Sequence, residues 1–243
     1  MKYLRCGWPL LRKVSLMENN YQYLQKILEQ YYAVCKPDYI KPRLFVWASA
    51  FVPVEILRAV DVAVFYPESF AAMCATLGMV SEFTILSEGE NLSTDVCAYA
   101  RVFNGITQPG KVRTKNLPLP DMLIVTNNQC GTIGYWWQQL AEKYRVPVYV
   151  LDFPKRNNTN LTGVNEYISR QVNDFIRWLE TAGLKFDEPK FKDSLRQTRR
   201  ANDAWRQIQA LRKLQPVPVG IAEMTNVMFP IVTMRGLEIT ATY

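Results

Sequence analysis

Four short apolar segments, each followed by a helical pattern, constrain the fold of this chain most strongly. They cover residues 43–49, 62–66, 121–127 and 146–152, and each has the length and composition of a buried strand. Strands that alternate with helices along a chain form a parallel sheet with right-handed crossovers. We therefore predict an α/β fold built on a parallel sheet.

The predicted sheet divides the chain into three parts. Residues 1–42 contain an amphipathic pattern and are expected to form an N-terminal helical segment. Residues 43–160 are expected to form the α/β domain, with a Rossmann-like sheet flanked by helices. Residues 161–243 carry two long amphipathic patterns and a shorter helical stretch, which predict additional long helices in the C-terminal third.

Two cysteines stand where such a sheet presents ligands. Cys130 closes an apolar run before a helical pattern, and Ser93 and Thr94 are good N-cap residues for a helix over 95–101 that contains Cys97. Both thiols are therefore expected in first helical turns, at the edge where open α/β sheets bind ligands. Helix N-termini favour the thiolate, which binds metal or attacks an electrophile. The alternative is a small buried hydrophobe, as cysteines often are.

The remaining composition removes several classes of site. The chain contains no histidine, which excludes a Ser-His-Asp triad, a Cys-His pair and a histidine-ligated metal within it. Its five cysteines include no Cys-x-x-Cys pair, which argues against a zinc ribbon or a thioredoxin-type pair. Cys74 lies among apolar residues of a helical pattern and is expected in the core. Acid–base chemistry then falls to carboxylates, lysines, tyrosines or water.

Charge and glycine content limit the expected partners. The net charge is +7, but acidic residues interleave with the late basic residues and no nucleic-acid motif accompanies them, so we expect no nucleic-acid binding. No glycine-rich phosphate loop occurs, and no nucleotide is expected to bind this chain. No apolar run reaches the roughly 20 residues that span a bilayer, and Arg5, Arg12 and Lys13 interrupt any signal-like segment. We expect no membrane association and a cytoplasmic location.

Five segments in a fixed order resemble one known family. They are FVPVEILRA (51–59), YPESFAAMC (66–74), VCAYAR (96–101), NNQCGT (127–132) and VPVYVLD (146–152). They are similar to the D-component family of 2-hydroxyacyl-CoA dehydratases, which also contains benzoyl-CoA reductase subunits. The resemblance implies that homologous subunits pair and that each holds an iron–sulfur cluster through three cysteines. It also implies a separate ATP-hydrolysing iron–sulfur activator that delivers a low-potential electron.

The resemblance maps Cys97 and Cys130 onto two ligands of a [4Fe-4S] cluster. In the family the third cysteine comes from a second α/β domain nearer the carboxyl terminus, whereas this sequence has no cysteine after Cys130. We expect a chain truncated before that domain. The alternatives are that Cys74 supplies the third ligand or that the subunit has lost its cluster.

The implied function is that of a subunit in a reductive acyl-CoA enzyme of the dehydratase type. A CoA-thioester carbonyl would be reduced to a ketyl radical, after which the 2-hydroxyl group leaves. Glu55 is a candidate for proton handling, or else a solvated carboxylate in a first helical turn. Arg101 is a candidate for the CoA tail or a structural ion pair, and Asn127 and Asn128 for hydrogen bonds to the cluster or for capping.

Three alternative functions remain open from the sequence. The reductase branch of the family would deliver the electron to an aromatic ring, as a benzoyl-CoA-reductase-type subunit. A cluster-free scaffold subunit would contribute only one wall of an active site. A thiol-redox or electron-transfer protein would use Cys97 and Cys130 directly, although no Cys-x-x-Cys pair supports it.

Overall fold

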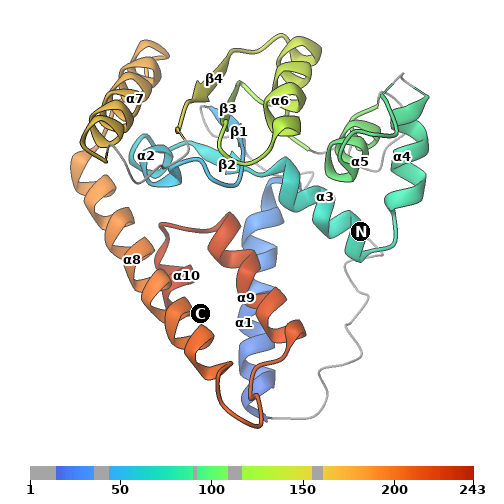
Figure 1. The fold of residues 1–243 in the computed structure, drawn as a ribbon, viewed down its shortest axis with the longest axis vertical. Coiled ribbons are helices and arrows are strands. Elements are labelled where there is room, and N and C mark those ends of the chain that lie inside the picture. The colour runs from blue at the N-terminus through green and yellow to red at the C-terminus, as the bar shows by residue number, and fades with distance from the viewer. Residues whose placement is uncertain (1–14, 36–43, 90–91, 109–116, 155–160) are drawn as a thin grey trace.

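The sheet has four parallel strands, as the sequence predicts (Figure 1). The computed structural model describes residues 15–35, 44–89, 92–108, 117–154 and 161–243. In these ranges the strands lie in the order β2-β1-β3-β4, and every pairing is parallel. Their bounds are β1 Phe45–Ala48, β2 Ala63–Phe65, β3 Met122–Thr126 and β4 Val148–Leu151. The expected α/β class is confirmed.

The centre of the sheet is buried on both faces. Every residue of β1 and β3 is buried, which explains why these segments read as continuous apolar runs without alternation. Trp47 of β1 packs edge-on against Phe103 and Tyr144, with both ring centroids 5.1 Å away. These rings join the sheet to helices that follow in the sequence. The core therefore holds α5 and the end of α6 against the sheet.

Five helices accompany the strands: α2 Val54–Ala59, α3 Pro67–Thr76, α4 Val80–Glu88, α5 Ala98–Ile106 and α6 Gly131–Tyr144. The apolar pattern after β2 continues through Met79, but it forms two helices and not one. The helix ends at Thr76, Gly78 adopts a left-handed φ of 72°, and α4 starts at Val80. Glycine takes that conformation without steric cost, so the chain turns there.

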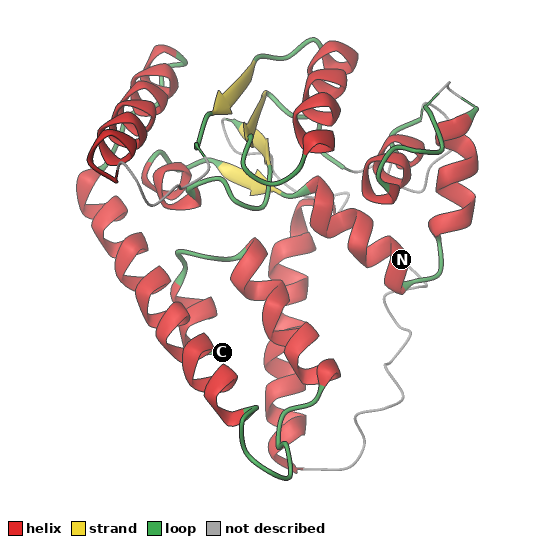
Figure 2. Ribbon diagram, viewed as in Figure 1, coloured by secondary structure: helices red, strands yellow, loops and turns green. Residues whose placement is uncertain are grey.

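The C-terminal third is helical, as expected. It contains α7 Leu161–Thr181, α8 Glu188–Leu211, α9 Ile221–Thr233 and the short α10 Glu238–Thr242. Figure 2 shows that these helices and the loops between them contain no strand among the residues drawn in colour. Asp187 caps α8 by accepting a hydrogen bond of 3.0 Å from the Lys190 N–H, as an N-cap aspartate should.

The N-terminal helix α1 (Ser15–Tyr31), followed by the 3-10 turn Tyr32–Cys35, joins the C-terminal helices to the sheet. Figure 1 shows α1 beside α9, and the Tyr31 ring meets the Phe229 ring edge-on at 5.5 Å. The Tyr31 hydroxyl also accepts a hydrogen bond of 2.8 Å from the Tyr66 N–H at the end of β2. Residues far apart in sequence therefore share one core.

Some expectations fall outside the described residues. These include the segment 1–14 with Cys6, and the proposed domain boundaries near residues 42 and 160, so the division into three parts stays a prediction. Among the helices described, none is long and apolar enough to cross a membrane.

Candidate functional site

Cys97 and Cys130 occupy equivalent positions. Each is the N-cap residue of its helix, Cys97 before α5 and Cys130 before α6, and both thiols are exposed. Cys97 was expected inside the first turn of a helix over 95–101 with Ser93 or Thr94 as its N-cap, and this was wrong. Ser93 and Asp95 form a local turn, and helical structure begins at Ala98. Their exposure also removes the interpretation of these two residues as buried hydrophobes.

Helices α5 and α6 contact each other through side chains and run in the same direction. The Phe103 ring meets the Trp136 ring at 6.0 Å, and one turn further along α5 the Thr107 hydroxyl lies 3.0 Å from Nζ of Lys143. Phe103 follows Cys97 by six residues and Trp136 follows Cys130 by six residues. The two thiols therefore stand at the same end of a parallel helix pair.

The other described cysteines differ in environment. Cys74 is buried in α3, as expected, and burial raises the pKa of its thiol to about 12. Burial likewise raises the pKa of Cys35 to about 11. A thiol that resists ionisation is a poor metal ligand, which argues against Cys74 as a third ligand. In the part of the chain that the structure covers, no three His, Cys, Asp or Glu residues gather closely enough to hold a metal ion.

Glu68 is a residue of the site that the sequence did not indicate. It lies in the first turn of α3, after β2, and its Oε2 accepts a hydrogen bond of 2.6 Å from the Ala50 N–H beyond β1. Its Oε1 accepts one of 2.8 Å from Nε2 of Gln129, the residue before Cys130. Burial raises the pKa of Glu68, opposed by these two hydrogen bonds. The Glu68 carboxylate thus links the segments that follow β1, β2 and β3, next to Cys130.

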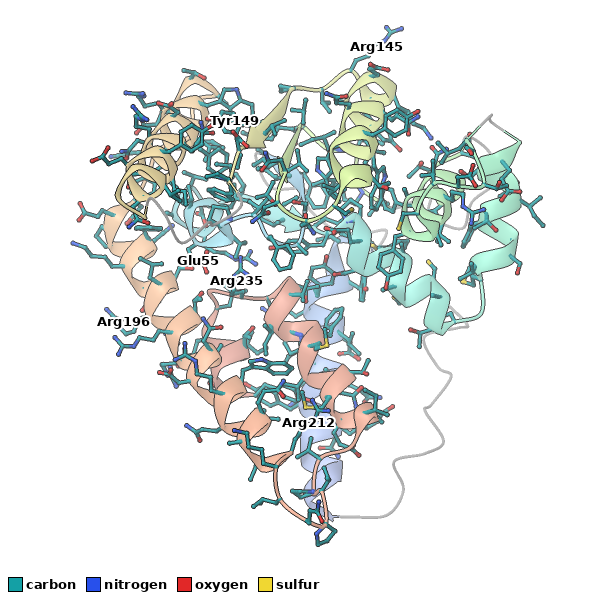
Figure 3. The ribbon with its side chains drawn as sticks, in the orientation of Figure 1. Glu55, Arg145, Tyr149, Arg196, Arg212 and Arg235 are labelled. Carbon is teal, nitrogen blue, oxygen red and sulfur yellow. The ribbon has the colours of Figure 1, made fainter. Side chains whose placement is uncertain are left out.

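Glu55 faces the C-terminal helices. It is buried in α2, where its Oε1 accepts a hydrogen bond of 2.7 Å from the Thr198 hydroxyl and lies 3.2 Å from Nε of Arg235 (Figure 3). The Arg235 N–H is not aligned for a hydrogen bond to this oxygen, so charge attraction dominates the contact. The alternative of a solvated carboxylate was wrong. The proposed proton-handling role stays a prediction, and the partners of Glu55 are those of a structural carboxylate.

Arg101 forms a structural ion pair, one of the two roles that the sequence suggested for it. Its Nη1 lies 2.5 Å from Oε1 of Glu88 in α4, and its Nε donates a hydrogen bond of 3.1 Å to the Val96 carbonyl. Both contacts anchor the segment that leads into Cys97. The suggested contact with a CoA tail stays a prediction.

Asn127 and Asn128 differ in their surroundings. Asn127 donates to the Asp152 carboxylate and accepts a hydrogen bond of 2.8 Å from the Phe153 N–H, so it joins the end of β3 to the end of β4. Asn128 is exposed. The geometry of Asn127 favours the capping role, while hydrogen bonding of either amide to a cluster stays a prediction.

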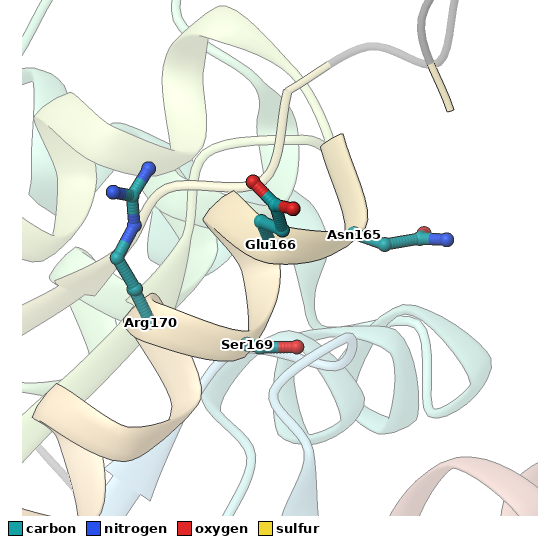
Figure 4. Close-up of a pocket in the computed structure, with 4 residues that line it drawn as sticks. All are labelled: Asn165, Glu166, Ser169 and Arg170. Atoms are coloured by element: carbon teal, nitrogen blue, oxygen red, sulfur yellow. The ribbon is translucent and has the colours of Figure 1, made fainter. Parts of the chain in front are cut away.

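A surface pocket of about 550 Å³ is lined by residues of α7 alone, Asn165, Glu166, Ser169 and Arg170 (Figure 4). Its side chains point outward from one helix and include none of the candidates at the sheet edge. One helical face does not enclose a small molecule, so this pocket is not the candidate site.

The structure thus defines a parallel α/β protein with two exposed cysteines at neighbouring helix starts, and the comparisons identify its family. Residues 49–243 match the sequence model of the 2-hydroxyglutaryl-CoA dehydratase D-component, and the chain belongs to this family.

Relatives come from both branches of the family. The chain is 30% identical over 194 residues to the (R)-phenyllactyl-CoA dehydratase alpha subunit of Clostridium sporogenes, covering 79% of this chain and 48% of that protein. It is 28% identical over 197 residues to the (R)-2-hydroxyisocaproyl-CoA dehydratase alpha subunit of Clostridioides difficile, covering 80% and 48%. It is 24% identical over 179 residues to a benzoyl-CoA reductase subunit of Thauera aromatica, covering 70% and 41%. The chain spans about half the length of the curated relatives it matches.

Proposed function

We propose that this chain acts as a subunit of a reductive acyl-CoA enzyme of the 2-hydroxyacyl-CoA dehydratase type. The observation that carries the proposal is the pair of exposed thiols at matching N-caps of two parallel helices. Helix N-termini stabilise thiolates, and thiolates are the ligands of iron–sulfur clusters. Names of relatives from both branches support the reaction class, and the greater identity to the dehydratase subunits favours dehydration over ring reduction.

The residues fit a cluster in part. Cys97 and Cys130 provide two suitable donors, and Cys74 is unsuitable because it is buried and resists ionisation. A third ligand for a [4Fe-4S] cluster would therefore come from outside the described residues of this chain. When bound, the cluster would supply the electron that reduces the thioester carbonyl to a ketyl radical. A homologous second subunit and an ATP-hydrolysing activator belong to the same proposal.

The chain's own residues would hold the site in place. Glu68 and Gln129 link the start of α6 to the ends of β1 and β2, and Arg101 links the approach to Cys97 to α4. Each thiol is thereby held by its own set of contacts. Such fixed ligand positions are what a metal or cluster site needs from its surroundings.

Anaerobic reconstitution with iron and sulfide tests the proposal through a set of serine variants. We expect the wild-type chain to develop the visible absorption of an iron–sulfur cluster and C97S and C130S to lose most of it. C74S is the matched control and should retain it, because that thiol is buried in the core. Equal absorption in C97S, C130S and wild type would contradict the assignment of the ligands, and an absence of absorption in wild type would contradict cluster binding by this chain.

A further inference from the structure

Arg235 connects the C-terminal helices to the edge of the sheet. It stands in the turn between α9 and α10, and its Nη2 donates a hydrogen bond of 2.7 Å to the Val52 carbonyl. Its Nε lies 3.2 Å from Glu55 in α2, and its side chain is only 21% exposed. A guanidinium can serve a carbonyl and a carboxylate at once because its donors form a rigid fork. Arg235 therefore holds both the loop after β1 and the helix that follows it.

The loop that Arg235 holds also contacts the Cys130 side of the site. The N–H of Ala50, two residues before Val52, donates to Glu68, which in turn accepts from Gln129 next to Cys130. The loop is anchored further by the Ser49 hydroxyl, which accepts a hydrogen bond of 3.1 Å from the Thr126 N–H at the end of β3. These contacts form an unbroken path from α9 and α10 to the start of α6.

The polar contacts of the Cys97 segment are separate from this path, although α5 packs against α3, the helix that carries Glu68. Arg101 of α5 makes these polar contacts, with the Val96 carbonyl before the helix and with Glu88 of α4. A change at Arg235 should therefore affect the Cys130 segment more strongly than the Cys97 segment. The difference between the two segments can be measured by amide exchange.

We propose that Arg235 is a positioning residue that fixes the loop 49–53 and, through Glu68 and Gln129, the N-cap segment of α6 with Cys130. The importance of Cys130 rests on the proposed function, whereas the path itself does not. Glu68 is only partly exposed and both of its hydrogen bonds are partly buried, so a displacement of the loop is passed on to Gln129.

Hydrogen–deuterium exchange on the cluster-free full chain tests the path. In R235Q we expect amides of residues 50–52 and 127–133 to exchange about tenfold faster, while those of 96–101 change less than about twofold. R196Q is the matched control, because Arg196 makes only an exposed pair with Asp193 on α8 and should change neither segment. Faster exchange to the same extent around both cysteines, or no change at 127–133, would overturn the proposal.

A second variant tests whether Glu68 carries the effect. E68A should accelerate exchange at 127–133 by itself, and the double variant R235Q/E68A should be no faster there than E68A. Additive effects of the two substitutions would refute the path. If R235Q does not fold, R235K is used instead, since one ammonium group cannot serve both partners and should give the same pattern with smaller increases.

Because exchange is measured without a cluster, the two proposals fail separately. If the chain binds no iron but R235Q shows the selective exchange, the positioning role stands and the proposed function is refuted. If C97S and C130S lose the cluster but R235Q shows no selective exchange, the proposed function stands and the positioning role is refuted.

Discussion

Replacing Glu55 with glutamine removes a buried charge and nearly preserves the shape of the side chain. The amide oxygen can still accept the hydrogen bond from Thr198, so the change isolates the attraction between Glu55 and Arg235. Removing one partner of a buried ion pair costs about 3–5 kcal/mol, because the other charge is left uncompensated. Arg235 retains 21% exposure to solvent, which partly screens it. We therefore expect a loss of about 2–3 kcal/mol in the free energy of unfolding.

Thermal unfolding followed by circular dichroism measures this loss. For a chain of this size each kcal/mol shifts the midpoint by about 2–4 °C, so E55Q should unfold about 4–12 °C below wild type. E188Q is the control, because Glu188 forms an exposed pair with Lys192 and its replacement should leave the midpoint unchanged. In a double-mutant cycle, E55Q and R235Q should be less than additive. A midpoint of E55Q equal to that of E188Q, or full additivity, would refute the reasoning.

Three further substitutions test other parts of the structure. Y31F deletes the acceptor of the buried Tyr66 N–H and should lower the free energy of unfolding by about 1–3 kcal/mol in urea titrations, and an unchanged midpoint would show that this contact is dispensable. G105A places a methyl group 1.9 Å from the Phe83 carbonyl oxygen and should destabilise α4 and α5 by about 1–3 kcal/mol, which wild-type stability would disprove. Burial raises the Glu68 pKa above its ordinary value of 4.5, so the folded chain binds this proton more tightly than the unfolded chain does. The stability that this gives at low pH is lost as pH rises through the folded pKa. E68Q should lack this decline in unfolding midpoints measured between about pH 4 and pH 7, and parallel profiles for the two proteins would contradict the shift.

The strands were predictable because each satisfies one simple physical condition. Parallel strands covered on both faces are apolar throughout, and the segments around β1 and β3 show this without interruption. The turn at Gly78 was missed because apolar residues continue through it, and only the backbone conformation separates α3 from α4. The local sequence also placed the start of α5 too early, although it located Cys97 at the helix N-terminus.

The contacts of the site could not be predicted in the same way. The Glu68 contact with Gln129 spans 61 residues and that of Glu55 with Thr198 spans 143, and no local pattern records such distances. Glu55 and Glu68 look alike in sequence, since each follows a strand in the first turn of a helix. Only the tertiary structure distinguishes their roles, because Glu55 faces the C-terminal helices and Glu68 faces the segment before Cys130.

Iron and acid-labile sulfide per chain, determined after strictly anaerobic purification and reconstitution, test the central claim most directly. Two exposed cysteines at one end of a helix pair predict that the protein takes up about four of each, the content of one [4Fe-4S] cluster, and that the double variant C97S/C130S takes up essentially none. Essentially no iron and sulfide in the wild-type chain would contradict the claim that these two cysteines form a cluster site here.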